Sequence, residues 1–292
     1  MGSEELRAQA GALAARARAR GLRAVRRLGA HPRVLPLTAL LLRARTVRPA
    51  PIFFAREALG SRRTCVYRLR ASGMAVAIRH RSGDVVTLGE VFHEHDYEPV
   101  GDAALQLGDV RRIVDLGANI GLFGVFAAAR WPQAQIVGFE PDPANAAVHE
   151  RTIAINALGR RWRLVRAAAG AQDGSAAFIA GDVALSRLAG AEDASASEEA
   201  ARIEVPVRDV LAEIAGADLV KMDIEGGEWA ILGDARLRSS PPRVLVLEYH
   251  PRFCPEADPR GAVEAALGLA GMRTQSIWHR ADGHGMLWAW QS

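Results

Sequence analysis

The chain has few of the residues that mark extracellular or membrane proteins. Only two of its 292 residues are cysteines, Cys65 and Cys254, and neither belongs to a metal-binding spacing. Free thiols are typical of a protein kept in a reducing compartment. No apolar run approaches the roughly 20 residues of a membrane-spanning helix. The best candidate, residues 34–42, contains a proline and lacks a signal-peptide cleavage pattern. These absences predict a cytoplasmic protein with no transmembrane segment.

Lysine is also scarce, and the basic charge is unevenly distributed. Lys221 is the only lysine, whereas residues 1–63 contain 14 arginines and three acids. Loosely spaced leucines and several prolines predict that this Arg-rich N-terminal segment is helical and partly disordered. Such a segment can contact nucleic acid or a membrane surface. No aromatic residue precedes Phe53, so stacking on bases is not expected, and neither partner is favoured.

The middle of the chain changes to a strand pattern. Apolar and polar residues alternate at 66–70 and 74–78, and a further short apolar run occupies residues 85–88. Alternation of this kind is typical of half-buried strands. Residues 64–108 are therefore predicted to form a small β meander with some helix, placed before the main domain.

From residue 109 to residue 292, short apolar strands alternate with helices. Uninterrupted apolar strands in such an alternation favour a parallel sheet with helices on both faces. The last two strands are close enough in sequence to form an antiparallel hairpin, and the Gly- and Ala-rich residues 181–201 are predicted to be a long loop. We therefore predict an α/β, Rossmann-like domain. Its predicted strands are 112–116, 135–140, 163–168, 219–224, 244–249, 273–278 and 286–290, and its predicted helices are 122–130, 143–157, 228–237 and 261–269.

The first strand leads directly into the sequence DLGANIG. Gly117 and Gly121 allow a tight turn and let a ligand approach the backbone at a helix N-terminus. A dinucleotide-binding turn needs GxGxxG, but this turn is GxxxG, with Asp115 two residues before the first glycine. An acid at that place repels a pyrophosphate and suits the cationic methionine end of S-adenosylmethionine. A purely structural turn, capped by Asn119, is the alternative.

The second strand ends in the sequence FEPDP. Glu140 follows Asp115 by 25 residues, which is the length of one strand–helix–strand unit, and Pro141 comes next. An acid here can accept hydrogen bonds from both ribose hydroxyls of an adenosyl group. This motif alone does not separate NAD from S-adenosylmethionine, but together with the acid before the glycine turn it favours S-adenosylmethionine.

Acids also follow the two strands near the C-terminus, in the sequences KMDIEGGEW and LEYH. The carboxyl edge of an open α/β sheet is where ligands bind, so we expect the side chains there to converge. Such a group can remove a proton from a hydroxyl or bind a divalent metal. The structural alternative is that Glu225 and Glu228 cap the following helix and that Lys221 forms an ion pair. The residues predicted to converge are Asp223, Glu225, Glu248 and His250.

In this order and spacing, the four motifs resemble those of FkbM-type methyltransferases. Arg79, Asp84, Phe92 and Tyr97 resemble the upstream segment of that family, so the resemblance covers residues 76–290. It implies a class I methyltransferase fold with a terminal hairpin, and S-adenosylmethionine as the cofactor. Asp223 and Glu225 fall on the DxEG motif of the family. The residues on its donor-binding motifs are Asp115, Gly117, Asn119, Gly121 and Glu140.

The resemblance implies methyl transfer to oxygen, often on sugar hydroxyls or natural products, and sometimes to an amide nitrogen of a peptide. An alcohol is protonated at neutral pH, so a base is needed. We expect His250 or Glu225 to be that base, with Asp223 orienting the acceptor. The unperturbed pKa of histidine, about 6.5, suits the role. A divalent metal is possible in this group but is not predicted.

The predicted function is therefore S-adenosylmethionine-dependent O-methylation of a small molecule or glycan that carries a hydroxyl group. Peptide N-methylation and nucleic-acid methylation are the alternatives, although the [Asn/Asp]-Pro-Pro-[Tyr/Phe] tetrapeptide of enzymes that methylate a flipped base is missing. An inactive scaffold would not need the acids that are present at each expected position. An NAD-dependent oxidoreductase would need the glycine spacing that the first turn lacks.

Overall fold

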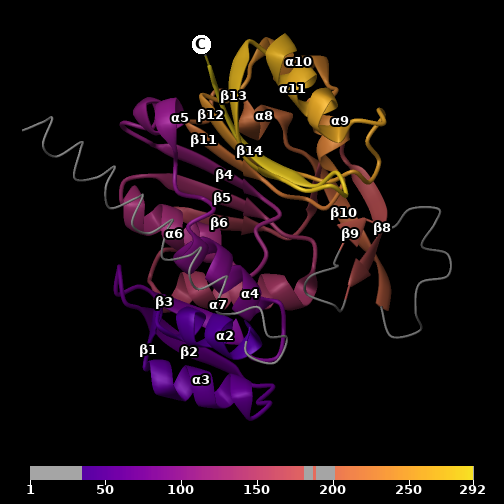
Figure 1. Ribbon diagram of the computed structural model, residues 1–292. Coiled ribbons are helices and arrows are strands. Elements are labelled where there is room, and N and C mark those ends of the chain that lie inside the picture. The colour runs from indigo at the N-terminus through magenta and orange to yellow at the C-terminus, as the bar shows by residue number, and fades with distance from the viewer. Residues whose placement is uncertain (1–34, 181–186, 189–200, 292) are drawn as a thin grey trace, which may run out of the picture.

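The computed structural model of the protein describes residues 35–180, 187–188 and 201–291 (Figure 1). Most of the Arg-rich segment predicted for residues 1–63, and most of the loop predicted for residues 181–201, lie outside these ranges. Among the described residues, no helix combines the length and the apolar character needed to cross a membrane.

The main domain is built on a seven-stranded sheet with the strand order β13-β14-β12-β11-β4-β5-β6. Strands β4, β5, β6, β11 and β12 run parallel, and β14 pairs antiparallel with both β12 and β13. The predicted α/β fold, a mostly parallel sheet that ends in an antiparallel hairpin, is confirmed. The strands are β4 (Arg112–Leu116), β5 (Gln135–Phe139), β6 (Trp162–Val165), β11 (Leu219–Met222), β12 (Val244–Tyr249), β13 (Met272–His279) and β14 (Gly285–Gln291).

Helices cover both faces of this sheet. Successive side chains of its strands point to opposite sides, so both faces carry apolar side chains that helices bury. Ile113 packs into one apolar cluster and the next residue, Val114, packs into the other. The first cluster is shared with α6 (Leu122–Arg130) and α7 (Pro143–Ile155). The second is shared with the helices that follow β10 along the chain. These helices are α8 (Leu211–Ile214), α9 (Glu228–Leu232), α10 (Ala235–Ser239) and α11 (Pro259–Leu269).

A small antiparallel sheet, β1-β2-β3, lies beyond α7, at the indigo end of Figure 1. The predicted hairpin is present as β2 (Thr64–Leu69) and β3 (Ala75–Arg79). Strand β1 (Val47–Arg48) adds residues of the predicted N-terminal segment to this sheet, and the domain boundaries stay predictions. The neighbouring helices are α2 (Leu35–Ala44) and α3 (Ala50–Ala58), whereas α5 (Gly101–Gln106) contacts β14 of the main sheet.

The strand predicted at residues 85–88 is wrong. These residues belong to the helix α4 (Asp84–Gly89), which continues as the π-helix η1 (Glu90–Glu94). Val85, Leu88 and Val91 are buried at helical spacing, so one helical face packs on the core. A short apolar run does not distinguish a strand from a buried helix, and packing decided between them.

Two further predicted elements are each divided in two, and several other bounds shift by one or two residues. The strand predicted at residues 163–168 is two strands, β6 and β7 (Ala168–Gly170). Strand β7 belongs to a second sheet of order β7-β10-β8-β9, which the sequence did not indicate; many of its residues are Gly, Ser and Ala, which have low strand propensity. The helix predicted at residues 228–237 is split into α9 and α10, because Asp234 begins α10 by accepting a hydrogen bond from the backbone N–H of Arg236. The other strands of the second sheet are β8 (Gly174–Ala180), β9 (Arg187–Leu188) and β10 (Ala201–Asp209).

Substitution of Gly124 tests the packing of α6 on the sheet. A Cβ atom at this position would overlap the ring of Trp162. Alanine favours a helix over glycine by about 1 kcal/mol, but overpacking costs about 1–3 kcal/mol. We therefore expect Gly124→Ala to lower the free energy of unfolding, measured by urea denaturation. Gly268→Ala in α11, where a Cβ meets open space, is the matched control and should leave stability unchanged or raise it. Equal urea midpoints for Gly124→Ala and the unsubstituted protein would contradict this packing.

Candidate functional site

The predicted site residues come together because their strands are neighbours and run in the same direction. Strand β4 lies between β5 and β11, and β12 lies next to β11. The carboxyl ends of these four strands therefore meet at one edge of the sheet. The DLGANIG turn follows β4, Glu140 follows β5, Asp223 follows β11, and His250 follows β12.

The turn after β4 adopts a left-handed backbone at three positions. Gly117 has φ +76°, Asn119 has φ +47° and Gly121 has φ +86°. A Cβ atom at Gly117 would overlap the backbone carbonyl of Asp223, so glycine is required where the turn crosses the end of β11. The side chain of Asn119 accepts a hydrogen bond from the backbone N–H of Ile120, at 2.8 Å. The predicted tight turn is present. Asn119 bonds within the turn, but α6 begins at Gly121 without a side-chain cap, so the capping Asn of the structural alternative is not found.

A buried ammonium group holds this turn against β11. Lys221 Nζ donates hydrogen bonds to the carbonyl oxygens of Leu116 at 3.3 Å and Gly117 at 2.7 Å. It also lies 3.6 Å from Asp115 Oδ1 and 3.6 Å from Asp223 Oδ2. The structural ion pair considered for Lys221 is therefore present. The pKa of Lys221 is raised, because these carboxylates outweigh the effect of burial.

Asp115 is fully buried beneath the turn. Neither of its carboxylate oxygens accepts a hydrogen bond within the described part of the chain. Burial raises the pKa of Asp115 to about 6, although the charge of Lys221 acts in the opposite direction. Asp115 is thus an ionised group at neutral pH whose two oxygens remain open to a donor.

Glu140 is held by three hydrogen-bond donors. Its Oε2 accepts from the backbone N–H of Asn119 at 2.8 Å, and its Oε1 accepts from the N–H of Asp142 at 2.9 Å and from Asn145 Nδ2 at 3.3 Å. Burial raises the pKa of Glu140 to about 7, because it outweighs these donors. A carboxylate has about four lone-pair directions, so one of them stays available.

The same network reaches the upstream segment. Asn145 Oδ1 accepts a hydrogen bond from Arg79 Nη2 at 2.6 Å, and Arg79 is paired with the buried Asp84 at 2.8 Å. Arg79 and Asp84 are two of the residues on which the resemblance to the FkbM family depends. Arg79 in β3 and Asp84 in α4 connect these two elements to α7, the helix that begins beside Glu140.

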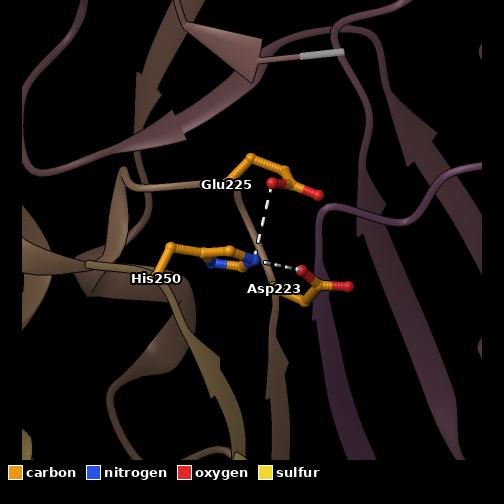
Figure 2. Close-up of side chains that lie close together, drawn as sticks. All are labelled: Asp223, Glu225 and His250. Atoms are coloured by element: carbon orange, nitrogen blue, oxygen red, sulfur yellow. Dashed lines mark ion pairs between the residues drawn. The ribbon is translucent and has the colours of Figure 1, made fainter. Parts of the chain in front are cut away.

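Asp223, Glu225 and His250 face one another at the end of β11 (Figure 2). His250 Nε2 lies 3.4 Å from Glu225 Oε2 and 3.9 Å from Asp223 Oδ1. On its other side, His250 Nδ1 is 3.0 Å from Oε1 of the buried Glu228. Glu228 also accepts hydrogen bonds from the backbone N–H groups of Ile224 and Gly226. It therefore stabilises the turn before α9, whereas the helix itself begins at Gly227 without the side-chain cap that the structural alternative expected.

The protonation of these groups differs from what the unperturbed values suggest. Burial lowers the pKa of His250, but the hydrogen bond and charge of Glu228 raise it. The charges of Asp223 and Glu225 add to this effect, and the pKa reaches about 10. The unperturbed value of about 6.5 therefore does not describe His250, whose ring is protonated at neutral pH. Burial and the charge of Asp223 raise the pKa of Glu225 to about 7 and that of Glu248 to about 8.

Two adjoining cavities open at this edge of the sheet. One has a volume of about 80 Å³ and the other about 190 Å³. Both are lined by Gly117, Asn119, Asp223 and Glu225. Only the first reaches Glu140 and Pro141, and only the second reaches Lys221 and Glu248. The predicted residues Asp115, Gly121 and His250 are buried and line neither of these two cavities.

Several lining residues were missed as site residues, and three of them are considered for their chemistry. Asn145 and Phe178 line the first cavity, and Glu90 lines the second. Burial, followed by the charge of Asp223, raises the pKa of Glu90 to about 7. Asn145 follows the FEPDP motif within the first turn of a helix, and this position could have identified it as a site residue. Glu90 and Phe178 lie in segments without a recognisable motif, so only the fold brings them to the site.

Known proteins share features of this chain. The sequence profile of the methyltransferase FkbM domain matches residues 115–268, more than half of the chain. The methyltransferase sdnD of Sordaria araneosa is 40% identical over 67 residues, 23% of this chain and 24% of that protein. The chain thus matches about a quarter of the length of this relative.

Two solved structures are similar in part. The methyltransferase domain of METTL16 is 13% identical, with a TM-score of 0.44, over 86% of this chain and 79% of that chain. TYW2 of M. jannaschii in complex with AdoMet is also 13% identical, with a TM-score of 0.42, over 79% of this chain and 85% of that chain.

The matched profile includes the glycine turn, Glu140 and the group formed by Asp223, Glu225 and His250. The sheet that carries them has the terminal antiparallel hairpin of a class I methyltransferase. On this match of more than half of its length, the chain belongs to the FkbM methyltransferase family.

Proposed function

We propose that this protein transfers a methyl group from S-adenosylmethionine to a hydroxyl of a sugar, glycan or natural product. S-adenosylmethionine is the expected cofactor of the family. The observation that carries the proposal is the meeting of two cavities at Gly117, Asn119, Asp223 and Glu225. A donor in this cleft would present its methyl group beside a set of carboxylates.

The residues present fit the cofactor. Glu140 has a lone-pair direction left for a ribose hydroxyl, and Phe178 and Ala169 offer apolar contacts in the same cavity. Asp115 has two buried oxygens without a hydrogen-bond partner in the described chain, and its negative charge suits the cationic methionine end. The left-handed turn at Gly117 lets the cofactor approach the backbone. We propose Asp115, Gly117, Asn119, Gly121, Glu140 and Pro141 as the residues that form this cofactor site.

The acceptor needs more help than the donor does. A sulfonium carries an activated methyl group, whereas an alcohol is almost fully protonated at neutral pH. We expect Asp223 to orient the acceptor hydroxyl, and its proton to pass to a carboxylate oxygen of Glu225 or Glu248. Both carboxyls lie on the cavity linings, while protonated His250 stabilises their charge from behind. Alignment of the acceptor oxygen with the methyl carbon supplies the rest of the acceleration.

The acceptor class stays a proposal, as does the cytoplasmic location. Amide nitrogen and nucleic acid remain the alternatives, and the Arg-rich residues 1–34 that bear on nucleic acid lie outside the described chain. Analysis of the methylated product separates these possibilities.

Calorimetric titration with S-adenosylmethionine and S-adenosylhomocysteine tests the cofactor. We expect micromolar binding by the purified chain. Asp115→Asn should raise the Kd for S-adenosylmethionine at least about tenfold, which is about 1.4 kcal/mol, because a buried negative charge is lost. The matched control is Asp109→Asn, which changes an acid that is 69% exposed at the start of the domain. No binding by the folded, unsubstituted chain would refute the proposal.

Because the pKa of Glu140 is raised to about 7, we expect cofactor binding to depend on pH near neutrality. The carboxylate is ionised at about pH 8 and protonated at about pH 6, so its capacity to accept hydrogen bonds falls as the pH falls through 7. We expect the affinity for S-adenosylhomocysteine to decrease by up to about tenfold over this range. Glu140→Gln should bind weakly at pH 8 and lose most of this dependence. The same slope in both proteins would show that another group titrates.

Substitution of the two carboxyl groups tests their role in proton removal. Transfer of labelled methyl from S-adenosylmethionine would be followed with a panel of hydroxylated acceptors, sugars first. Glu225→Gln and Glu248→Gln should each lower turnover, by up to about 10²–10⁴-fold, with affinity for S-adenosylhomocysteine nearly unchanged. Glu264→Gln, at an exposed ion pair with Arg260, is the control. Full turnover in both site variants would exclude them as the base.

A further inference from the structure

Two carboxylate oxygens and one imidazole nitrogen, each able to bind a metal ion, converge where the two cavities meet. Each of Asp223, Glu225 and His250 offers one atom, and these atoms all lie within 4.8 Å of one another. Two ligands that each lie about 2.1 Å from a metal ion are up to about 4.2 Å apart. The separations of 3.4 Å and 3.9 Å from His250 Nε2 fall within that limit. They exceed the usual length of a hydrogen bond, which is about 2.7–3.2 Å for N–H···O.

The histidine is fixed in the orientation of a metal ligand. His250 is 5% exposed, and its Nδ1 is bound to a carboxylate oxygen of Glu228, a side chain with no exposed surface. Metal-binding histidines typically use one ring nitrogen for such a carboxylate and the other for the ion. The Nε2 atom is therefore directed at Asp223 and Glu225 by a buried contact (Figure 2). This arrangement distinguishes the group from a chance cluster of surface acids.

The backbone contributes to the same arrangement. Glu225 has φ +54°, a left-handed conformation that is uncommon outside glycine, and Gly226 has φ +102°. The hydrogen bonds from Ile224 and Gly226 to Glu228 hold this turn. Backbone strain of this kind often lies at ligand sites. Glu228 thus holds both the turn that carries Glu225 and the ring of His250.

The charge balance at the site also favours a cation. Asp223, Glu225, Glu248 and Glu90 line one cavity, and Lys221 is the cationic side chain on that lining. Lys221 is already engaged with Asp115 and with the other oxygen of Asp223. A divalent ion bound in place of the His250 Nε2 proton would offset the charge of these carboxylates more fully than that proton does.

We propose that Asp223, Glu225 and His250 bind a divalent first-row transition-metal ion such as Mn²⁺, through one oxygen of each carboxylate and Nε2 of the imidazole. The ion would take the place of the proton that Nε2 otherwise carries. Mixed imidazole and carboxylate ligands suit such ions better than Ca²⁺. Three protein ligands leave positions open on the side of the cavities. The role of the ion rests on the proposed function: it would bind the acceptor hydroxyl and lower its pKa, while Glu248, which is not a ligand, accepts the proton.

The test is metal binding by the full chain, measured without reference to methyl transfer. Protein treated with EDTA and freed of chelator would be titrated with MnCl2 by calorimetry, and free Mn²⁺ followed by electron paramagnetic resonance. One saturable site per chain is expected. His250→Ala and Asp223→Asn should each weaken binding at least tenfold, and Glu228→Gln about 10–100-fold. Glu264→Gln should leave it unchanged.

Binding of S-adenosylhomocysteine by each variant shows that it is folded. The inference is overturned if neither MnCl2 nor ZnCl2 binds to a chain that does bind S-adenosylhomocysteine; the proposed function would then stand without an ion. It is equally overturned if the ion binds but both His250→Ala and Asp223→Asn retain full affinity, because the ion would lie elsewhere. Saturable Mn²⁺ binding that depends on these residues, in a chain without affinity for S-adenosylmethionine or S-adenosylhomocysteine, would support the metal site and refute the methyl transfer.

Discussion

The ammonium group of Lys221 connects the two halves of the site. It lies between strands β4 and β11, close to Asp115 and Asp223, and donates to the carbonyl oxygens of Leu116 and Gly117. Moving a charge into a protein interior costs several kcal/mol unless partners compensate it. Here each buried charge compensates another, so the position of the glycine turn and that of the acid group depend on one contact. The only lysine of the chain is at that contact.

Much of the central fold was predictable, because long-range packing and local pattern agree there. Strands β4 and β12 and helix α6 have the predicted bounds, since apolar strands between polar turns have few alternatives. The prediction failed where short apolar runs are ambiguous, at residues 85–88, and where small residues form strands, in β8. In both cases tertiary contacts decide the structure, and a local pattern does not contain them.

In the site as well, sequence motifs predicted part of the arrangement, and contacts made only in the fold determine the rest. The strand ends place Gly117, Asp223 and Glu225 together, and the motifs alone indicated that much. The state of His250 could not be predicted, because its pKa depends on Glu228, which lies 22 residues earlier and meets it only in the fold. Glu90 joins the site from the π-helix η1, just beyond the run at 85–88 that was predicted to be a strand.

The bonds that run from Glu140 through Asn145 to Arg79 have a consequence for exchanging parts between related proteins. Asn145 belongs to α7 of the central domain, whereas Arg79 belongs to the small upstream sheet, and one hydrogen bond joins them. The upstream sheet is therefore not an independent module that can be grafted onto another catalytic core. A chimera that keeps Glu140 correctly placed must take Arg79, Asp84 and Asn145 from the same parent. Recombination between relatives is constrained in the same way at the contact between Arg79 and Asn145.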